Sequence, residues 1–244
     1  MKWIPLFFML ISLNCLAQKP TIYGIGDSTM ANKPIENENP ERGWGQMLPL
    51  FFNEKINIDN RAVNGRSTKS FLDLNLWDAV YKNLKPGDYV FIQFGHNDGK
   101  VTDSTRYTNP HTVYRHNLIR YVTETRQKGA IPILFSSITR RNFNEQGVLI
   151  STHGDYTLET RLVAQEFNVP FIDMEYYTEL LEMKYGPEKS KQLHLHYKKG
   201  EIAFFPEGKE DNTHLCVKGA TEISKIAVEE LKKTNLDLIK YIKS

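Results

Sequence analysis

Cysteine is scarce in this sequence of 244 residues, which contains only Cys15 and Cys216. Cys15 lies in an apolar N-terminal leader, so a chain without the leader keeps one thiol and has no intramolecular disulfide. Such a chain depends on its buried core for stability. We expect Cys216 to be a small buried residue, with a reactive nucleophile as the alternative, because free cysteines are among the most buried residues.

An excess of one charge is also missing, since 31 basic and 29 acidic side chains give a formal net charge of +2. This balance argues against a nucleic-acid partner, because proteins that bind nucleic acids usually carry a basic face.

Long apolar runs are missing too. The apolar part of the leader, residues 3–13, is far shorter than the roughly 20 residues that span a bilayer. We therefore expect no stable membrane insertion.

The leader, MKWIPLFFMLISLNCLA (residues 1–17), has the pattern of a secretory signal peptide. One lysine precedes an apolar run, and Ala17 occupies a suitable cleavage position. We expect cleavage after Ala17, one domain over residues 18–244, and an exported protein that is periplasmic or extracellular. Lipoprotein anchoring through Cys15 is less favoured, because an asparagine precedes it where such signals have a small residue.

Strand-like and helix-like segments alternate along the rest of the chain. The strand-like segments are short, apolar and rich in β-branched or aromatic residues, and helices between them indicate crossover connections. This pattern predicts an α/β fold of three layers, α/β/α and flavodoxin-like, around a central five-stranded parallel sheet. Strands are expected at 21–24, 56–60, 89–94, 131–136 and 170–174, and helices at 45–52, 70–83, 111–128, 156–167 and 217–233. A long irregular stretch, residues 186–216, precedes the last helix and is expected to be functional.

Three polar, glycine-containing stretches follow predicted strands. They are Gly26-Asp27-Ser28, Val63-Asn64-Gly65 and Gly95-His96-Asn97-Asp98. Ligands of open parallel sheets bind outside the carboxyl ends of the strands. These three stretches are therefore the first candidates for a functional site.

Ser28 on its own is most simply a turn or helix-capping residue. A serine nucleophile needs a base to take its proton and a group that orients the base. The sequence DNTH, from Asp211 to His214, offers both within one turn, although Asp211 could merely cap the last helix. An oxyanion hole is available as well, from the backbone N–H groups of Ser28 and Gly65 and the neutral side-chain amide of Asn97.

Four sequence blocks, GDST, AVNGRS, FGHND and DNTH, resemble the motifs of the SGNH (GDSL-type) hydrolase superfamily, in the expected order. With their flanks, including GWGQ at 43–46 and NGRSTKSF at 64–71, they look most like the rhamnogalacturonan acetylesterase branch. The G-x-S-x-G elbow of α/β-hydrolases is absent from the sequence. The resemblance covers nearly the whole chain after the leader and has no departure at a catalytic position.

The resemblance implies a role for each of these residues. Ser28 is implied to be the nucleophile, His214 the general base and then acid, and Asp211 its partner. The Ser28 and Gly65 N–H groups and the Asn97 side chain are implied to form the oxyanion hole. No metal or cofactor is implied. The implied activity is a serine esterase that removes O-acetyl groups from the pectic polysaccharide rhamnogalacturonan, through an acetyl-serine intermediate.

Rhamnogalacturonan is a polyanion, and arginine recognises carboxylates well. We therefore assign carboxylate recognition to Arg66, Arg140 and Arg141 as a hypothesis, with solvated surface or local salt bridges as the alternative. Trp44 and Trp77 could stack on sugars, but ordinary core packing is the favoured interpretation.

His194 and His196 could form a metal pair, since alternate residues of an extended segment face the same way. No carboxylate or cysteine cluster accompanies them, so exposed loop residues or a substrate-contacting edge is the favoured interpretation. Other functions stay open: an esterase for acetylated xylan or other glycans, a lipid or acyl-thioester hydrolase, and a carbohydrate-binding protein without activity. The sequence gives no indication of oligomeric state.

Overall fold

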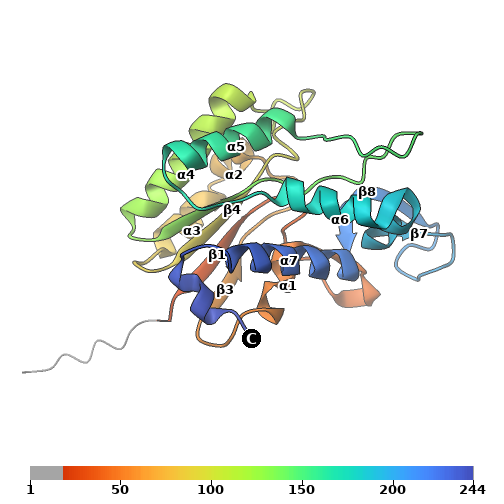
Figure 1. Cartoon of the computed structure of the whole chain (residues 1–244), viewed down its shortest axis with the longest axis horizontal. Helices are drawn as coiled ribbons and strands as arrows, with labels where there is room; N and C mark the ends of the chain where they lie inside the picture. Colours follow the sequence, from red (N-terminus) through yellow and green to blue (C-terminus); the bar gives the residue numbers. More distant parts are fainter. Residues whose placement is uncertain (1–18, 244) are drawn as a thin grey trace, which may run out of the picture.

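A five-stranded parallel sheet forms the centre of the computed structural model, which describes residues 19–243. The strand order is β3-β1-β4-β5-β6, and every pair of neighbours is parallel. The predicted α/β/α architecture is therefore confirmed, as Figure 1 shows. Its strands are β1 (Thr21–Gly26), β3 (Asn57–Asn60), β4 (Tyr89–Gln93), β5 (Ile131–Phe135) and β6 (Phe171–Ile172).

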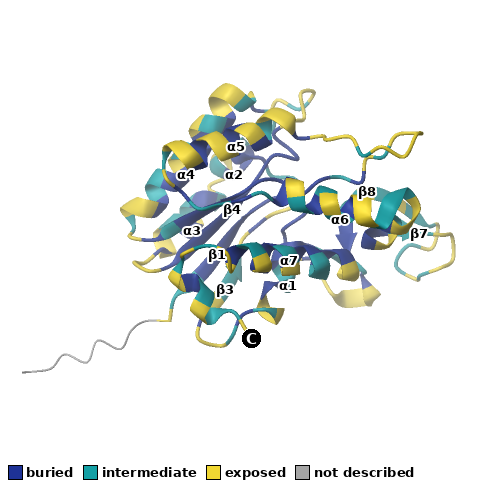
Figure 2. Cartoon of the chain, viewed as in Figure 1, coloured by how far each residue is buried: buried dark blue, intermediate teal, exposed yellow. Residues whose placement is uncertain are grey.

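Helices cover both faces of this sheet. One core cluster joins the sheet to residues of α1 (Trp44–Met47), α6 (Met174–Lys189) and α7 (Val217–Leu231). The other joins it to residues of four helices on the opposite face. The three middle strands are dark in Figure 2 because almost every residue in them is buried. The four helices are α2 (Thr68–Asp73), α3 (Leu76–Asn83), α4 (Arg115–Gln127) and α5 (Gly154–Glu166).

The predicted helix at 70–83 is two helices, α2 and α3, in the structure. Asn75 separates them in the left-handed conformation, with φ of 55°. Asparagine adopts this conformation more readily than most residues, so it can end one helix and start another. Short irregular helices join the other elements: η1 (Glu36–Glu38), η2 (Leu48–Leu50), η3 (Pro110–Tyr114), η4 (Ser190–Leu193) and η5 (Asp237–Tyr241).

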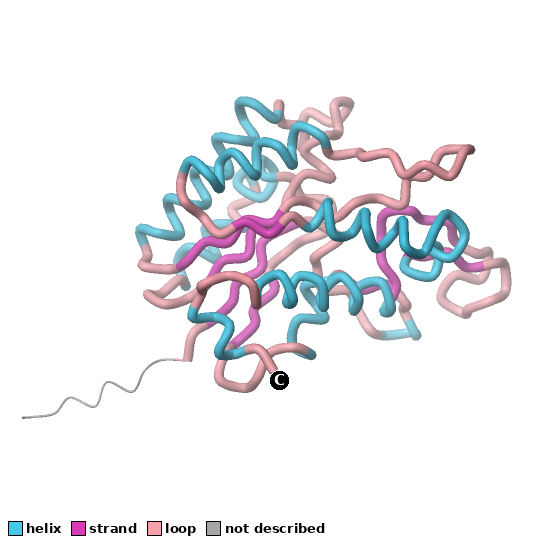
Figure 3. Tube along the Cα trace, viewed as in Figure 1, coloured by secondary structure: helices cyan, strands magenta, loops and turns pink. Residues whose placement is uncertain are grey.

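A second, three-stranded antiparallel sheet takes two of its strands from the stretch predicted to be irregular. Its order is β2 (Glu41–Arg42), β8 (Lys209–Cys216) and β7 (His194–Tyr197), and Figure 3 shows β7 and β8 as magenta strands away from the central sheet. The prediction missed it because β8 is a polar, half-exposed strand, KEDNTHLC, without the apolar run of a buried strand.

β8 contains a wide bulge opposite β7. Leu195 pairs with Asp211, but the preceding residue, His194, pairs with Leu215. Residues 212–214 therefore have no ladder partner on β7 and form a bulge within the strand. This bulge carries the DNTH block to the carboxyl edge of the central sheet.

The leader, its cleavage after Ala17 and lipidation of Cys15 lie outside the described residues. Within 19–243, none of the helices has the length and apolar character that crossing a membrane requires.

Candidate active site

Ser28, His214 and Asp211 form one hydrogen-bonded chain. His214 Nε2 lies 2.9 Å from Ser28 Oγ, and His214 Nδ1 lies 2.9 Å from Asp211 Oδ2. Ser28 follows β1, whereas the other two residues lie on β8. The structure thus brings together the three residues that the sequence motifs single out.

Asp211 accepts several hydrogen bonds from the bulge. Its Oδ1 accepts from the backbone N–H groups of Thr213 and His214, both at 2.9 Å. Burial alone would raise the pKa of Asp211, but the bonds from the His214 ring and from these N–H groups outweigh it and lower the pKa strongly. Asp211 is therefore an ionised acceptor that keeps the proton of neutral His214 on Nδ1, with the lone pair of Nε2 facing Ser28.

The turn that presents Ser28 is built on buried contacts. Asp27 is fully buried, and its Oδ1 accepts from the N–H and hydroxyl of Thr29. A Cβ at Gly26 would lie 2.7 Å from the carbonyl oxygen of Gln93, so the close approach of β1 and β4 there requires glycine. Burial raises the pKa of Asp27. Asp27 holds the turn, and its side chain makes no hydrogen bond or ion pair with His214 in the described part of the chain.

The proposed oxyanion-hole residues line the same pocket as Ser28. Gly65 has φ of +72°, which favours glycine. The side-chain amide of Asn97 donates to the carbonyl of Arg66 at 3.0 Å, which ties the block after β4 to the block after β3. An amide has two N–H donors, so one remains for a ligand.

The pocket around Ser28 has a volume of about 620 Å³. Its walls come from the carboxyl ends of β1, β3 and β4 and from the β7–β8 hairpin, and they combine polar, cationic and aromatic side chains. Asn64, His96 and Thr213 lie in stretches that the sequence already indicates as candidates for the site. The lining residues that sequence reasoning did not single out are Lys33, Glu41, Lys100, Leu195, Phe204, Phe205 and Lys209. Most belong to loops or polar strands, where neither periodicity nor a motif indicates that a side chain faces a ligand.

The three arginines assigned to carboxylate recognition lie in different places. Arg140 lines the pocket. Arg66 is half-exposed beside it, and its Nε donates to the carbonyl of Asn64 at 3.1 Å. The assignment of Arg141 is wrong: its guanidinium is buried and bonds to Ser190, Asn212 and Pro187.

His194 and His196 also have internal partners. His194 is buried, with Nε2 2.7 Å from Glu182 Oε1, so the expectation of an exposed loop residue is wrong for it. His196 Nε2 lies 2.8 Å from Asn212 Oδ1. Among residues 19–243, no group of three or more histidine, cysteine or acidic side chains is arranged to hold a metal ion.

The two tryptophans and the thiol belong to the interior, as expected. Trp44 and Trp77 are fully buried, and Cys216 is a buried free cysteine.

A parallel α/β sheet with a serine–histidine–aspartate chain at its carboxyl edge is the arrangement of a serine hydrolase. Sequence comparison gives the family. The model of the GDSL-like Lipase/Acylhydrolase family matches residues 25–198, and the chain belongs to this family.

Its relatives include proteins named as rhamnogalacturonan acetylesterases and a solved structure whose title names no activity. "Rhamnogalacturonan acetylesterase RhgT" of Bacillus subtilis (strain 168) is 36% identical over 94% of this chain and 97% of its own. "Rhamnogalacturonan acetylesterase" of Emericella nidulans is 29% identical over 92% of this chain and 89% of its own. The crystal structure of Bacillus subtilis protein YxiM superimposes with a TM-score of 0.76 and 27% identity, over 90% of this chain and 58% of that longer one.

Proposed function

We propose that this protein is a serine esterase that removes O-acetyl groups from rhamnogalacturonan, through an acetyl-serine intermediate. The Ser28–His214–Asp211 chain carries the chemical part of the proposal. A relative named as a rhamnogalacturonan acetylesterase, aligned over 94% of the chain, supports the substrate.

The first half-reaction forms the acetyl-enzyme. Ser28 Oγ attacks the acetyl carbonyl while His214 Nε2, 2.9 Å away, takes the hydroxyl proton. Asp211 stabilises the imidazolium that forms, because it is ionised and bonded to Nδ1. The C–O bond to the sugar then breaks, and His214 returns the proton to the departing sugar oxygen.

The second half-reaction releases acetate. His214 takes a proton from water, the hydroxyl oxygen attacks the acetyl-serine carbonyl, and Ser28 leaves with the proton returned. In both steps negative charge develops on the carbonyl oxygen. The Ser28 and Gly65 N–H groups and the Asn97 amide are proposed to bind this oxyanion, and each such donor is worth about 10²–10³ in rate.

The character of the pocket supports a sugar substrate over a lipid. Its lining is rich in charged and amide side chains, with Phe204 and Phe205 as the aromatic part. A long acyl chain needs an extended apolar channel, and within the described residues the lining offers only short apolar stretches. Aromatic faces beside polar groups are suited to sugar rings.

Acetate release by residues 18–244 from acetylated rhamnogalacturonan and acetylated xylan, measured side by side, tests this function. We expect faster release from the pectic polymer and a loss of about 10⁶-fold in kcat for Ser28→Ala. Unchanged melting temperature and retained polysaccharide binding would show that Ser28→Ala is folded. Faster release from xylan would reject the substrate, and undiminished turnover by Ser28→Ala would reject the mechanism.

We further propose that the leader directs export, with cleavage after Ala17. Its charge and apolar pattern support this, and a polymeric substrate from plant cell walls requires an enzyme outside the cytoplasm. N-terminal sequencing of the secreted protein tests it: a mature N-terminus at Gln18 is expected, and a lipidated Cys15 would replace the proposal with membrane anchoring.

A further inference from the structure

The four cations that line the pocket fall into two kinds. Lys33 Nζ lies 2.7 Å from Glu41, and Lys209 Nζ lies 3.7 Å from Asp211. Lys100 and Arg140 have no carboxylate within 4.0 Å among the residues that the structure describes. The pocket wall therefore carries two positive charges that have no ion-pair partner among the described residues.

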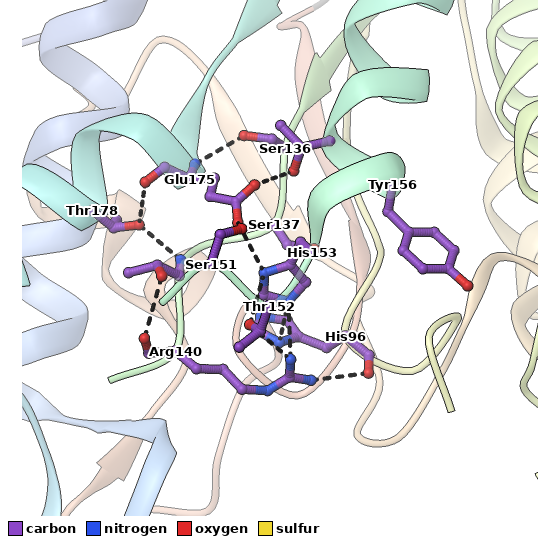
Figure 4. Close-up of polar contacts among 12 residues, drawn as sticks. His96, Ser136, Ser137, Arg140, Ser151, Thr152, His153, Tyr156, Glu175 and Thr178 are labelled. Atoms are coloured by element: carbon purple, nitrogen blue, oxygen red, sulfur yellow. Dashed lines mark hydrogen bonds and ion pairs between the residues drawn. The ribbon is translucent and has the colours of Figure 1, made fainter. Parts of the chain in front are cut away.

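Neutral acceptors hold the Arg140 guanidinium in this wall (Figure 4). Nη1 donates to Thr152 Oγ1 at 3.0 Å and to His153 Nε2 at 3.4 Å, and Nη2 donates to the carbonyl of His96 at 3.1 Å. A guanidinium has five N–H donors. The one on Nε and the second on Nη2 have no acceptor among the described residues, and together they can meet the two oxygens of a carboxylate.

A buried hydrogen-bond chain fixes the acceptor next to Arg140. His153 Nε2 lies 3.0 Å from His96 Nδ1, and His153 Nδ1 lies 3.5 Å from Glu175 Oε1. Burial opposes ionisation of Glu175, but bonds from His153 and Thr157 outweigh it and lower the pKa of Glu175. The ionised carboxylate places the His153 proton on Nδ1, so Nε2 keeps its lone pair for Arg140 and His96.

Arg140 stays a cation in spite of its position. Burial lowers the pKa of Arg140, while Asp27 and Glu175 act in the opposite direction without bonding to it. Partial burial and repulsion from Arg106 and Arg140 lower the pKa of Lys100, while Asp103 and Asp27 act in the opposite direction without an ion pair to it. Two cations that repel each other in the wall of a ligand pocket are stabilised by a bound anion.

We propose that Arg140 and Lys100 form a binding site for the carboxylate of a uronic acid residue near the acetylated sugar. This inference rests on the proposed function, because it takes the ligand to be an acidic glycan. It separates an acidic pectic substrate from a neutral xylan, which the catalytic residues alone do not do. Arg140 presents the planar donor edge, and Lys100 at the exposed rim adds a mobile charge.

Inhibition of 4-nitrophenyl acetate hydrolysis tests the site without acetylated polysaccharide. The inhibitors are a deacetylated rhamnogalacturonan oligosaccharide and the same oligosaccharide with its carboxylates reduced to alcohols. We expect the acidic form to inhibit the wild-type enzyme more tightly than the reduced form. The ratio of the two inhibition constants should fall roughly tenfold in Lys100→Gln and in Arg140→Gln.

Two further variants sharpen this test. Arg140→Lys keeps the positive charge and loses the planar donor edge. The ratio of the two inhibition constants should therefore fall by less than it does in Arg140→Gln. Lys199→Gln is the matched control: Lys199 is exposed, paired with Glu207 at 2.6 Å and not part of the pocket lining, and its ratio should match the wild type. Raised salt should weaken inhibition by the acidic form alone.

Equal inhibition by the acidic and reduced forms in the wild-type enzyme would overturn the site. An unchanged ratio of the two inhibition constants in Lys100→Gln would also overturn the site. The Lys100 side chain is exposed, so it can be replaced without disturbing the core. If the ratio falls as expected but acetylated rhamnogalacturonan is not deacetylated, the carboxylate site stands and the proposed substrate fails.

Discussion

Arg141 is joined to Asn212 by two hydrogen bonds of 2.9 Å each. Its backbone N–H donates to the Asn212 carbonyl, and its guanidinium donates to Asn212 Oδ1. Asn212 lies in the bulge between Asp211 and His214, so a buried arginine outside the pocket holds the strand segment that carries both residues.

Replacement of Arg141 by glutamine should therefore lower kcat more than it raises KM. The change removes the anchor of the bulge and leaves buried acceptors unpaired, at about 1–3 kcal/mol of unfolding free energy. Steady-state kinetics and urea unfolding measure the two effects. Arg126→Gln is the control: its exposed guanidinium bonds the backbone carbonyls of Phe167 and Asn168 on the far helical layer, so the change should leave kcat and KM as in the wild type. A rise in KM with an unchanged kcat would contradict the role of Arg141 in holding the bulge.

Asp211→Asn should lower kcat by about 10⁴-fold, by analogy with the same change in the serine-hydrolase template. The amide cannot hold the proton of His214 on Nδ1, so Nε2 no longer reliably accepts from Ser28. Turnover of 4-nitrophenyl acetate measures this directly. A decrease in kcat of less than tenfold would mean that Asp211 stabilises the bulge but does not orient His214 for catalysis.

Asn97→Ala should lower kcat by about 10²–10³-fold, because it removes one proposed oxyanion donor. Asn117→Ala is the comparison. Asn117 is also buried, and its amide donates to Thr68 Oγ1 at 3.1 Å, so the loss of a buried amide is similar but lies away from the pocket. Equal loss of kcat in both variants would reject the specific role of Asn97.

Stability should fall as the pH drops below about 6.5, where histidines in the unfolded chain take up protons. Burial, together with neighbouring His153 and Arg140, lowers the pKa of His96 well below its usual value, and burial also lowers that of His153. The unfolded state then binds more protons than the folded state. Each histidine can remove up to about 1.4 kcal/mol per pH unit.

Urea unfolding between pH 7.5 and 5.5 measures this slope. Buried Asp98, whose pKa burial raises to about 7, contributes in the opposite sense over the same pH range in the wild type and in every histidine variant. His96→Gln and His153→Gln should each flatten it. His116→Gln, which changes an exposed histidine on α4, should leave the wild-type slope in place. A slope that no single histidine variant alters would place its origin elsewhere.

The sheet and the motif-bearing strand ends could be predicted because buried parallel strands are continuous apolar runs. Ser28 and Asn97 follow such strands, and Gly65 follows the half-exposed edge strand β3. The three residues converge because these strands are parallel neighbours. The β7–β8 hairpin could not be predicted in the same way. Its register changes between His194 and Leu195, and this depends on contacts with distant residues that local sequence does not encode.

Arg140 and Arg141 also show that local sequence does not reveal which side chain faces the ligand. Both follow β5, and the sequence gives them the same assignment. The structure places Arg140 on the pocket wall and buries Arg141 against Asn212, because successive residues of an extended segment point to opposite sides. Which of the two faces the ligand depends on the position of the bulge.

The 186 positions between Ser28 and His214 have a consequence for the timing of activity during synthesis. A growing chain completes β1 and its serine early, yet the base and its aspartate arrive with β8, just before the last helix. The growing polypeptide therefore cannot cleave esters until nearly the whole chain has been made. Early termination anywhere before residue 214 yields a nucleophile without its base.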